Sequence, residues 1–252
     1  PNVSWGLNTA QLHECFPHVP EDDVYLVNDF VAQALACRTP AMSDAIYIQP
    51  GEKDPAGVVS VIGAGTGIGS CSLAPDGNEG WVVLPSEAGH QSFSFRAGDE
   101  RRYEDFLLKE MGRTTVINDM VVTGRGLAML HRFVTGEDLL PQDVAARLNA
   151  ESEVSRKFAT FYGRAARNYA LSVLPTGGLI VTGGVAAKNH FLVDHDAFRE
   201  EFSNVSDYRD LLEKIPIRLN VNEESGIWGA AAYAVMMSEK RARRETPGGT
   251  NV

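Results

Sequence analysis

Apolar runs and helical stripes alternate along the chain. Short continuous apolar runs predict strands over residues 58–62, 179–182 and 215–221. Two more runs, which flank a Pro-Asp-Gly-Asn segment, predict a hairpin over residues 70–84. Apolar residues at helical spacing predict helices over residues 30–35, 100–111, 126–133, 154–174 and 226–237. This alternation predicts an α/β fold with mostly buried strands. Pro216 cannot donate to a strand ladder, so it suggests an edge position for the last strand.

One apolar run ends in two polar side chains. Val24, Leu26 and Val27 have the pattern of a strand interior, and Asn28 and Asp29 follow directly, without Gly or Pro. A carboxylate at the end of a buried strand can act as a base, and the adjacent amide can bind a hydroxyl group. Either side chain can equally well cap the helix that follows. This segment alone does not decide between the two interpretations.

Composition excludes several classes of function. The chain has 252 residues, enough for one large or two small domains with a sizeable core. Its net charge of −10 argues against nucleic-acid binding, which requires a basic face. No apolar run approaches the roughly 20 residues that span a bilayer, so no membrane association is expected. No secretory signal is visible, and Cys15, Cys37 and Cys71 form neither a disulfide framework nor a metal motif. We therefore expect a cytoplasmic protein.

A glycine-rich segment follows the predicted strand at 58–62. Four glycines in Gly63-Ala-Gly-Thr-Gly-Ile-Gly69 allow a sharp turn and a close approach of the backbone to a ligand. The Thr66 hydroxyl and successive N–H groups can bind phosphate oxygens. The segment matches neither GxGxxG, because position 68 is Ile, nor the Walker A motif, because no Lys-Ser/Thr follows. A simple hairpin turn is the alternative.

Two weaker motifs accompany it. Gly183-Gly184 follows the predicted strand at 179–182 and can admit a nucleotide, although an ordinary turn explains the pair as well. Glu87 and His90 lie three residues apart beside a glycine. One Glu and one His cannot complete a zinc site. Together they offer hydrogen-bond donors and acceptors, and the hydroxyl groups of a sugar need both. A surface turn with unrelated polar residues is the alternative.

Considered together, these segments resemble the bacterial-type glucokinases of the hexokinase and actin-like ATPase superfamily. The resemblance covers about residues 1–237 and rests on Leu26-Val-Asn-Asp-Phe30, Gly63-Ala-Gly-Thr-Gly-Ile-Gly69, Pro85-Ser-Glu-Ala-Gly-His90, Val122-Thr-Gly-Arg-Gly-Leu127 and Gly177-Gly-Leu-Ile-Val-Thr-Gly-Gly-Val185. Five motifs in the family's order are more specific than any one alone. They imply a two-lobe, actin-like ATPase (ribonuclease H-like) fold and ATP-dependent phosphorylation of glucose to glucose 6-phosphate in glycolysis.

The resemblance also implies a role for each matched residue. Asp29 is the implied base, and the implied sugar contacts are Asn28, Asp29, Glu87, His90 and Asp119. The family has Glu where this chain has Asp119, so a shorter side chain lengthens that contact or admits a water. The implied nucleotide contacts are Gly63, Gly65, Thr66, Gly67, Gly183 and Gly184. ATP and Mg²⁺ are the implied cofactors, no protein ligand is assigned to the metal, and a homodimer is one possible assembly.

One family segment does not occur in the sequence. The family opens with Asp-x-Gly-Gly-Thr-Asn on a phosphate-binding hairpin, which is not found here. We therefore expect an incomplete small lobe (1–40 and 224–240), a large lobe (41–223) and a disordered tail (241–252). The chain would then be a fragment or a shortened relative with impaired phosphate transfer. Two alternatives stay open: a non-catalytic sugar-binding or regulatory relative, and a kinase for another hexose.

Overall fold

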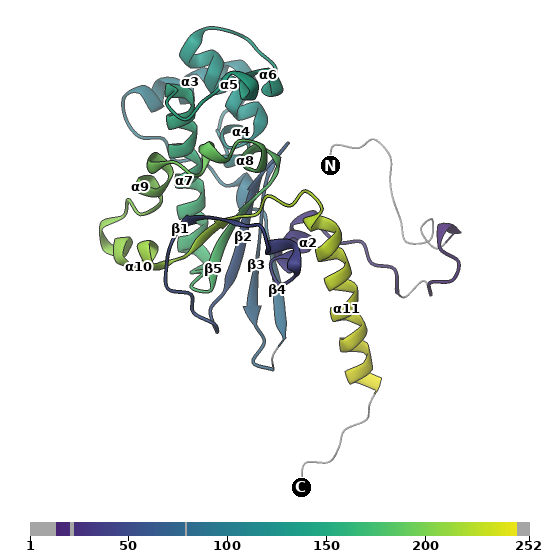
Figure 1. The fold of residues 1–252 in the computed structure, drawn as a ribbon. Helices are drawn as coiled ribbons and strands as arrows, with labels where there is room; N and C mark the ends of the chain where they lie inside the picture. The colour runs from purple at the N-terminus through teal and green to yellow at the C-terminus, as the bar shows by residue number, and fades with distance from the viewer. Residues whose placement is uncertain (1–13, 21–22, 79, 246–252) are drawn as a thin grey trace.

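A mixed β-sheet forms the centre of the molecule. The computed structural model describes residues 14–20, 23–78 and 80–245. Within them, the sheet consists of β1 (Ile46–Gln49), β2 (Val59–Ala64), β3 (Ile68–Pro75), β4 (Trp81–Ser86), β5 (Gly178–Thr182) and β6 (Ile217–Leu219). The strand order is β1-β6-β5-β2-β3-β4 (Figure 1). β5 is parallel to β6 and β2, whereas β2, β3 and β4 are antiparallel neighbours and β1 is antiparallel to β6. The predicted α/β class is confirmed.

Helices cover both faces of this sheet (Figure 1). The helices are α2 (Asp29–Ala36), α3 (Asp99–Met111), α4 (Asn118–Val121), α5 (Gly124–Thr135), α6 (Pro141–Arg147), α7 (Glu153–Val173), α8 (Gly184–Lys188), α9 (Asp196–Phe202), α10 (Arg209–Lys214) and α11 (Ser225–Glu245). Short 3₁₀ turns are η2 (Pro40–Met42), η3 (Ala88–His90), η4 (His190–Leu192) and η5 (Ser206–Tyr208). α2 and α11 lie on one side of the sheet, and α7 and α9 lie on the other.

Alternation along the strands divides the core into two clusters. In β2, Val59 and Val61 pack with α2, whereas Ile62 and Ala64 belong to the larger cluster around α7. Successive strand residues point to opposite faces, so a continuous apolar strand supplies both clusters. The predicted apolar stripe of α7 is buried in the larger cluster from Phe158 to Tyr169, whereas Val173 is only partly buried. The N-cap of the helix is Ser152, whose side chain accepts a hydrogen bond from the Ser155 N–H.

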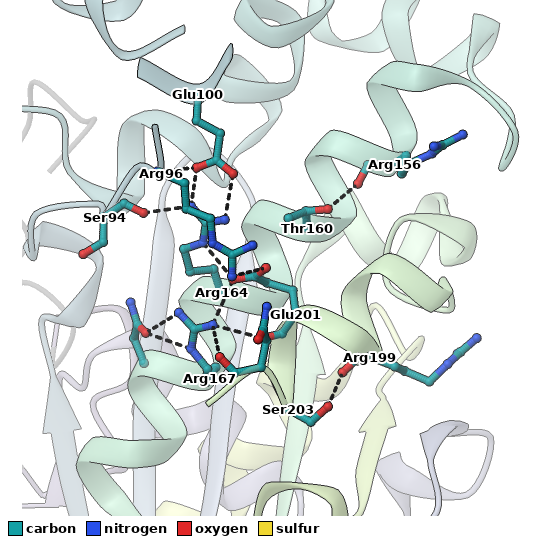
Figure 2. Close-up of polar contacts among 12 residues, drawn as sticks. Ser94, Arg96, Glu100, Arg156, Thr160, Arg164, Arg167, Arg199, Glu201 and Ser203 are labelled. Atoms are coloured by element: carbon teal, nitrogen blue, oxygen red, sulfur yellow. Dashed lines mark hydrogen bonds and ion pairs between the residues drawn. The ribbon is translucent and has the colours of Figure 1, made fainter. Parts of the chain in front are cut away.

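A buried group of charges connects three helices on the α7 side (Figure 2). Arg164 of α7 is 1% exposed, and its guanidinium donates to Glu100 of α3 and to Glu201 of α9. Arg96 and Arg167 also donate to Glu201. Burial alone would raise the pKa of the Glu100 carboxyl, but hydrogen bonds from Arg164 and the Arg96 N–H outweigh burial and hold that pKa below its ordinary value. These ion pairs join residues that are far apart in the sequence. They therefore fix α3 and α9 against α7.

The structure corrects two predictions about strands and adds a strand that was not predicted. Val24 to Val27 form no strand, because no other strand of the described residues lies beside them to satisfy their backbone hydrogen bonds. β6 is not an edge strand, because it lies between β1 and β5. Pro216 fits there because it precedes the strand, and its carbonyl accepts from the Leu179 N–H at 2.9 Å. The edge strand on this side of the sheet is β1, whose four residues were not predicted to form a strand.

The C-terminal helix extends beyond residue 237, where it was predicted to end. α11 continues to Glu245, five residues into the segment 241–252 that we expected to be a disordered tail, and residues 246–252 lie outside the described part. An ion pair of 2.7 Å between Arg241 and Asp23 accompanies this extension. The division into lobes at residues 41 and 223 stays a prediction. In the structure, α2 and α11 share a hydrophobic cluster with the sheet.

Candidate functional site

A cavity of about 440 Å³ opens where β2 and β5 end. Because these two strands are parallel, their carboxyl ends lie at the same edge of the sheet, which is a common location for ligand sites in α/β proteins. The lining residues come from α2 and its N-cap, the β2–β3 turn, the start of β3, the end of β4, η3 and its N-cap, and the end of β5 with the glycine that follows it. They are Asn28, Asp29, Phe30, Gln33, Gly65, Thr66, Gly67, Ile68, Gly69, Ser70, Ser86, Glu87, His90, Thr182 and Gly183.

The glycine-rich segment is a hairpin turn and a wall of the cavity at once. Gly65 N–H donates to the Gly67 carbonyl at 2.8 Å, which closes the turn between β2 and β3. Gly65, Thr66 and Gly67 line the cavity, and Thr66 is exposed. Gly63 lies inside β2 and does not line it. A Cβ at Gly63 would come within 2.7 Å of Thr182, so this glycine permits the close approach of β2 and β5.

The Gly183-Gly184 pair connects β5 to α8. Gly183 has φ of 91°, and a Cβ there would lie 2.4 Å from the Ala64 carbonyl oxygen, so only glycine fits without strain. Gly183 lines the cavity, whereas Gly184 is not one of the lining residues and has open space around it. The strand ends themselves are fixed by Tyr162 of α7. Its hydroxyl accepts from Ala64 N–H at 3.1 Å and donates to the Thr182 carbonyl at 3.4 Å.

Asn28 and Asp29 accept hydrogen bonds at the start of α2 and also line the cavity. The Asn28 side chain caps α2 by accepting from Phe30 N–H at 2.8 Å, and an Asp29 carboxylate oxygen accepts from the same N–H at 3.0 Å. Both residues are exposed and line the cavity. Phe30 anchors them, because its ring occupies the position where a Cβ of Gly69 would be, at 2.0 Å. Thus the start of α2 is packed directly on β3.

Glu87 and His90 lie at the mouth of the cavity on η3. Their side chains are 80% and 67% exposed, and His90 Nε2 lies 3.8 Å from a Glu87 carboxylate oxygen. Gly89 between them allows η3 to approach β3, since a Cβ there would lie 2.2 Å from the Ile68 carbonyl oxygen. The backbone of η3 is therefore held against β3, and the two exposed polar side chains that it carries can contact a ligand.

Asp119 differs from the other predicted sugar contacts. It is not among the residues that line the cavity. Its carboxylate accepts a hydrogen bond of 2.6 Å from the N–H of Ile68, the first residue of β3. The structure therefore brings Asn28, Asp29, Glu87 and His90 to one cavity and places Asp119 against Gly67 and Ile68.

Several lining residues escaped the sequence analysis. Gln33 accepts from the Ser225 hydroxyl at 2.8 Å and from the Thr182 hydroxyl at 3.4 Å, and so joins α2 to α11 and β5. Gln33 follows Asp29 by four residues, so helical spacing could have identified it. Ser70 and Ser86 are neighbours across the β3–β4 ladder, and no local sequence signal distinguished them.

The described residues contain no group of three His, Cys, Asp or Glu side chains placed to hold a metal ion. No helix within residues 14–20, 23–78 and 80–245 has the length and hydropathy of a membrane span. Cys15, Cys37 and Cys71 are free thiols, and burial raises the pKa of Cys71 to about 11.

Fold and cavity together define an enzyme of the sugar-kinase class with an actin-like ATPase fold. A glucokinase from an Antarctic psychrotroph is 25% identical with a TM-score of 0.77, over 91% of this chain and 73% of that chain. A ROK family glucokinase from Streptomyces griseus, solved in complex with glucose and AMPPNP, has a TM-score of 0.62 over 93% of this chain and 75% of that chain. Its identity of 16% supports the shared fold alone.

The chain belongs to the glucokinase family, whose model, described as Glucokinase, matches residues 1–237. The glucokinase of Synechocystis sp. is 28% identical over 92% of this chain and 74% of that protein. The glucokinase of Yersinia enterocolitica is also 28% identical, over 92% of this chain and 73% of that protein. The chain thus spans about three quarters of the length of these relatives.

Proposed function

We propose that the chain transfers the γ-phosphoryl group of ATP to the 6-hydroxyl of glucose. The observation that carries this proposal is one cavity lined by both the Asp29 carboxylate and the Gly65–Gly67 turn. A phosphoryl transfer requires a base near the acceptor and a phosphate cradle near the donor. Membership of the glucokinase family supports glucose as the acceptor, and the neighbour solved with AMPPNP supports ATP as the donor.

Asp29 is the proposed base. As the bond from the sugar oxygen to the γ-phosphorus forms and the bond to ADP breaks, the hydroxyl proton passes to the Asp29 carboxylate. Packing of Phe30 on Gly69 holds the start of α2 beside the turn. This packing positions the carboxylate relative to the phosphate cradle, and positioning supplies much of the acceleration in phosphoryl transfer.

Asn28, Glu87 and His90 are the proposed sugar contacts. The amide of Asn28 offers donors and an acceptor, Glu87 offers acceptors, and the imidazole of His90 offers a nitrogen of either kind. These three side chains border the cavity from two elements, the N-terminus of α2 and the turn η3. A hexose with hydroxyls on both faces can be held between them.

The nucleotide is proposed to lie along the glycines. The N–H groups of Gly65–Gly67 and the Thr66 hydroxyl would bind phosphate oxygens, and Gly183 and Gly184 would contact the adenosine side. Gly63 contributes through packing rather than contact. Mg²⁺ commonly binds through one or two carboxylates plus phosphate oxygens and water. Asp29 and Glu87 are such carboxylates, so the cavity suits an ion carried by ATP, which would neutralise charge on the transferred group.

Asp29→Asn tests the proposal directly. The amide keeps the size of the side chain but cannot accept the proton, so turnover should fall by about 10²–10⁴-fold. Glucose affinity should stay within about tenfold of the parent, because hydrogen bonding is retained. A coupled assay for glucose 6-phosphate measures turnover, and calorimetry measures glucose binding independently. Asp44→Asn, at an exposed aspartate, is the matched control. Near-parental turnover of Asp29→Asn would remove Asp29 from the mechanism.

A panel of hexoses separates the alternatives. Glucose should give the highest kcat/KM, and a higher value for mannose or an N-acetylated hexosamine would reassign the acceptor. Glucose binding without any turnover of the parent chain would identify a non-catalytic sugar-binding relative. A homodimer and a cytoplasmic location stay predictions for this chain.

A further inference from the structure

We propose that Gln33 is a positioning residue for Asp29, and that it acts through hydrogen bonds to Ser225 and Thr182. The inference deepens the proposed function and rests on it, because it concerns the helix that carries the proposed base. Gln33 lies on α2, four residues after Asp29, and both residues line the cavity. Residues at this spacing lie one turn apart on one face of a helix. A shift of Gln33 therefore moves Asp29 with it.

The amide oxygen of Gln33 accepts two hydroxyl groups from different elements. Gln33 Oε1 accepts from Ser225 Oγ, at the start of α11, at 2.8 Å. It also accepts from Thr182 Oγ1, at the end of β5, at 3.4 Å. Ser225 is 2% exposed and Thr182 is 4% exposed, so each hydroxyl requires a partner within the protein. Since an amide oxygen has two lone pairs, one atom serves both donors and joins α2, α11 and β5.

The other contacts of α2 hold it against the sheet with little control over its orientation. Val31 and Leu35 belong to the apolar cluster on this side of the sheet, and apolar attraction is not directional. Phe30 supplies one fixed point, because its ring lies where a Cβ of Gly69 in β3 would be. A helix held at one point can pivot about it. The hydrogen bonds of Gln33 supply a second point, on β5 and α11.

Close approach of α11 brings Ser225 within reach of Gln33. A Cβ at Gly229 would lie 1.7 Å from the Ala32 carbonyl oxygen, so glycine permits this approach of the two helices. Ser225 precedes Gly229 by four residues and therefore lies on the same face of α11. The hydrogen bond from Ser225 to Gln33 then sets the register of α11 along α2.

Thr182 connects Gln33 to the nucleotide side of the cavity. Side chains alternate along β5, so Thr182 lies on the same face as Ile180, which belongs to the apolar cluster around α2. The Thr182 carbonyl accepts from the Tyr162 hydroxyl on the opposite face, and the next residue, Gly183, lines the cavity. Gln33 thus relates the base to the strand end beside the proposed nucleotide site. Misplacement of a reacting group by about 1 Å can cost about 10²-fold in rate.

Ser225 is the partner that best separates positioning from ligand contact. Its side chain is buried, and its hydroxyl is bonded to Gln33. Thr182, by contrast, lines the cavity itself. Ser225→Ala removes the hydroxyl alone and leaves the amide of Gln33 in place. A lower kcat in this variant would therefore report the orientation of α2.

Steady-state kinetics of the parent, Gln33→Met, Ser225→Ala and the double variant test the assignment. Methionine is similar in length to glutamine but has no amide. Gln33→Met should lower kcat by about tenfold and keep the KM values for glucose and ATP within about threefold, because positioning acts on the transition state. Ser225→Ala should lower kcat by about three- to tenfold. The double variant should stay within about twofold of Gln33→Met, since both changes remove one interaction.

Ser203→Ala is the matched control. Ser203 is also a buried serine, and its hydroxyl donates to the Arg199 carbonyl oxygen at the end of α9. Its replacement should leave kcat within about twofold of the parent. If Gln33→Met does not fold, the comparison of Ser225→Ala with Ser203→Ala still decides. Equal kcat values for these two variants and the parent would overturn the inference.

Two further outcomes would also contradict a positioning role. A higher KM for either substrate at unchanged kcat in Gln33→Met would identify Gln33 as a ligand contact. Additive losses of kcat in the double variant would show that Gln33 and Ser225 act independently. Thermal unfolding of the same four proteins measures this coupling without turnover, and the Tm loss of the double variant should be smaller than the sum of the single losses. A parent without turnover contradicts the proposed function, whereas additive Tm losses contradict the inference.

Discussion

Glu201→Gln would remove the charge that three arginines share on the α7 side of the sheet. One carboxylate oxygen of Glu201 accepts from Arg164 Nε, Arg167 Nη1 and Arg96 Nη2, each at 2.9 Å. Glu201 is 3% exposed and Arg164 is 1% exposed, so water cannot replace the lost charge. In the variant, Glu100 is the one carboxylate of the described residues that still accepts hydrogen bonds from this group of arginines.

The expected cost follows from that burial. Removing one partner of a buried ion pair typically destabilises a protein by about 3–5 kcal/mol, and a neutral oxygen that still accepts hydrogen bonds favours the lower end. For a chain of this size, each 1 kcal/mol lowers Tm by about 2–4 °C. We therefore expect Tm to fall by about 6–12 °C, from the product of these two values at 3 kcal/mol.

Thermal unfolding at pH 7, followed by circular dichroism or calorimetry, measures this change. Glu200→Gln is the matched control, because Glu200 is the exposed neighbour on the same helix and its replacement should leave Tm within about 1 °C. A second variant, Glu201→Gln combined with Arg167→Gln, removes one excess positive charge and should recover part of the loss. Equal Tm values for Glu201→Gln and Glu200→Gln would refute the reasoning that burial makes the charge essential.

Two further predictions concern the same group of charges and the phosphate turn. The pKa of the Glu100 carboxyl lies below its ordinary value because hydrogen bonds from Arg164 outweigh burial. The ionised carboxylate therefore stabilises the fold above the unfolded-state pKa of about 4.3. This stabilisation disappears as the pH falls through the lowered folded-state pKa. Glu100→Gln should lower Tm at pH 7, and its Tm should converge on that of the parent only as the pH falls through this lowered pKa. A difference in Tm that does not depend on pH contradicts this. Thr66→Val and Gly67→Val should each weaken AMPPNP binding by about tenfold or more, while glucose binding changes little. Thr66→Val loses a hydroxyl group. Gly67→Val gains a Cβ that would lie 2.8 Å from an Asp119 carboxylate oxygen. Calorimetric titration of each ligand checks this, and equal losses would indicate a purely structural turn.

The elements built from local patterns were predictable from the sequence. The apolar stripe of α7 and the continuous apolar run of β2 identified their elements, because helical and strand periodicities are local properties. Glycines marked the β2–β3 turn and the end of β5 for the same reason, since a backbone position without space for Cβ requires glycine wherever it occurs. The predicted ligands Asn28, Asp29, Glu87 and His90 were likewise identified by short motifs, and they do line one cavity.

Only the tertiary structure decided which distant residues meet. Val24 to Val27 have an apolar pattern suited to a strand, but the part of the chain that the structure describes places no strand beside them, and pairing depends on residues far away in the chain. Tyr162 was predicted as part of an apolar stripe, yet its hydroxyl joins the ends of β2 and β5. Asp119 matches a family position by sequence, but its hydrogen bond goes to Ile68, 51 residues away. Such contacts are set by packing of whole elements, so the sequence identified the chemical groups of the site and the fold determined what each one touches.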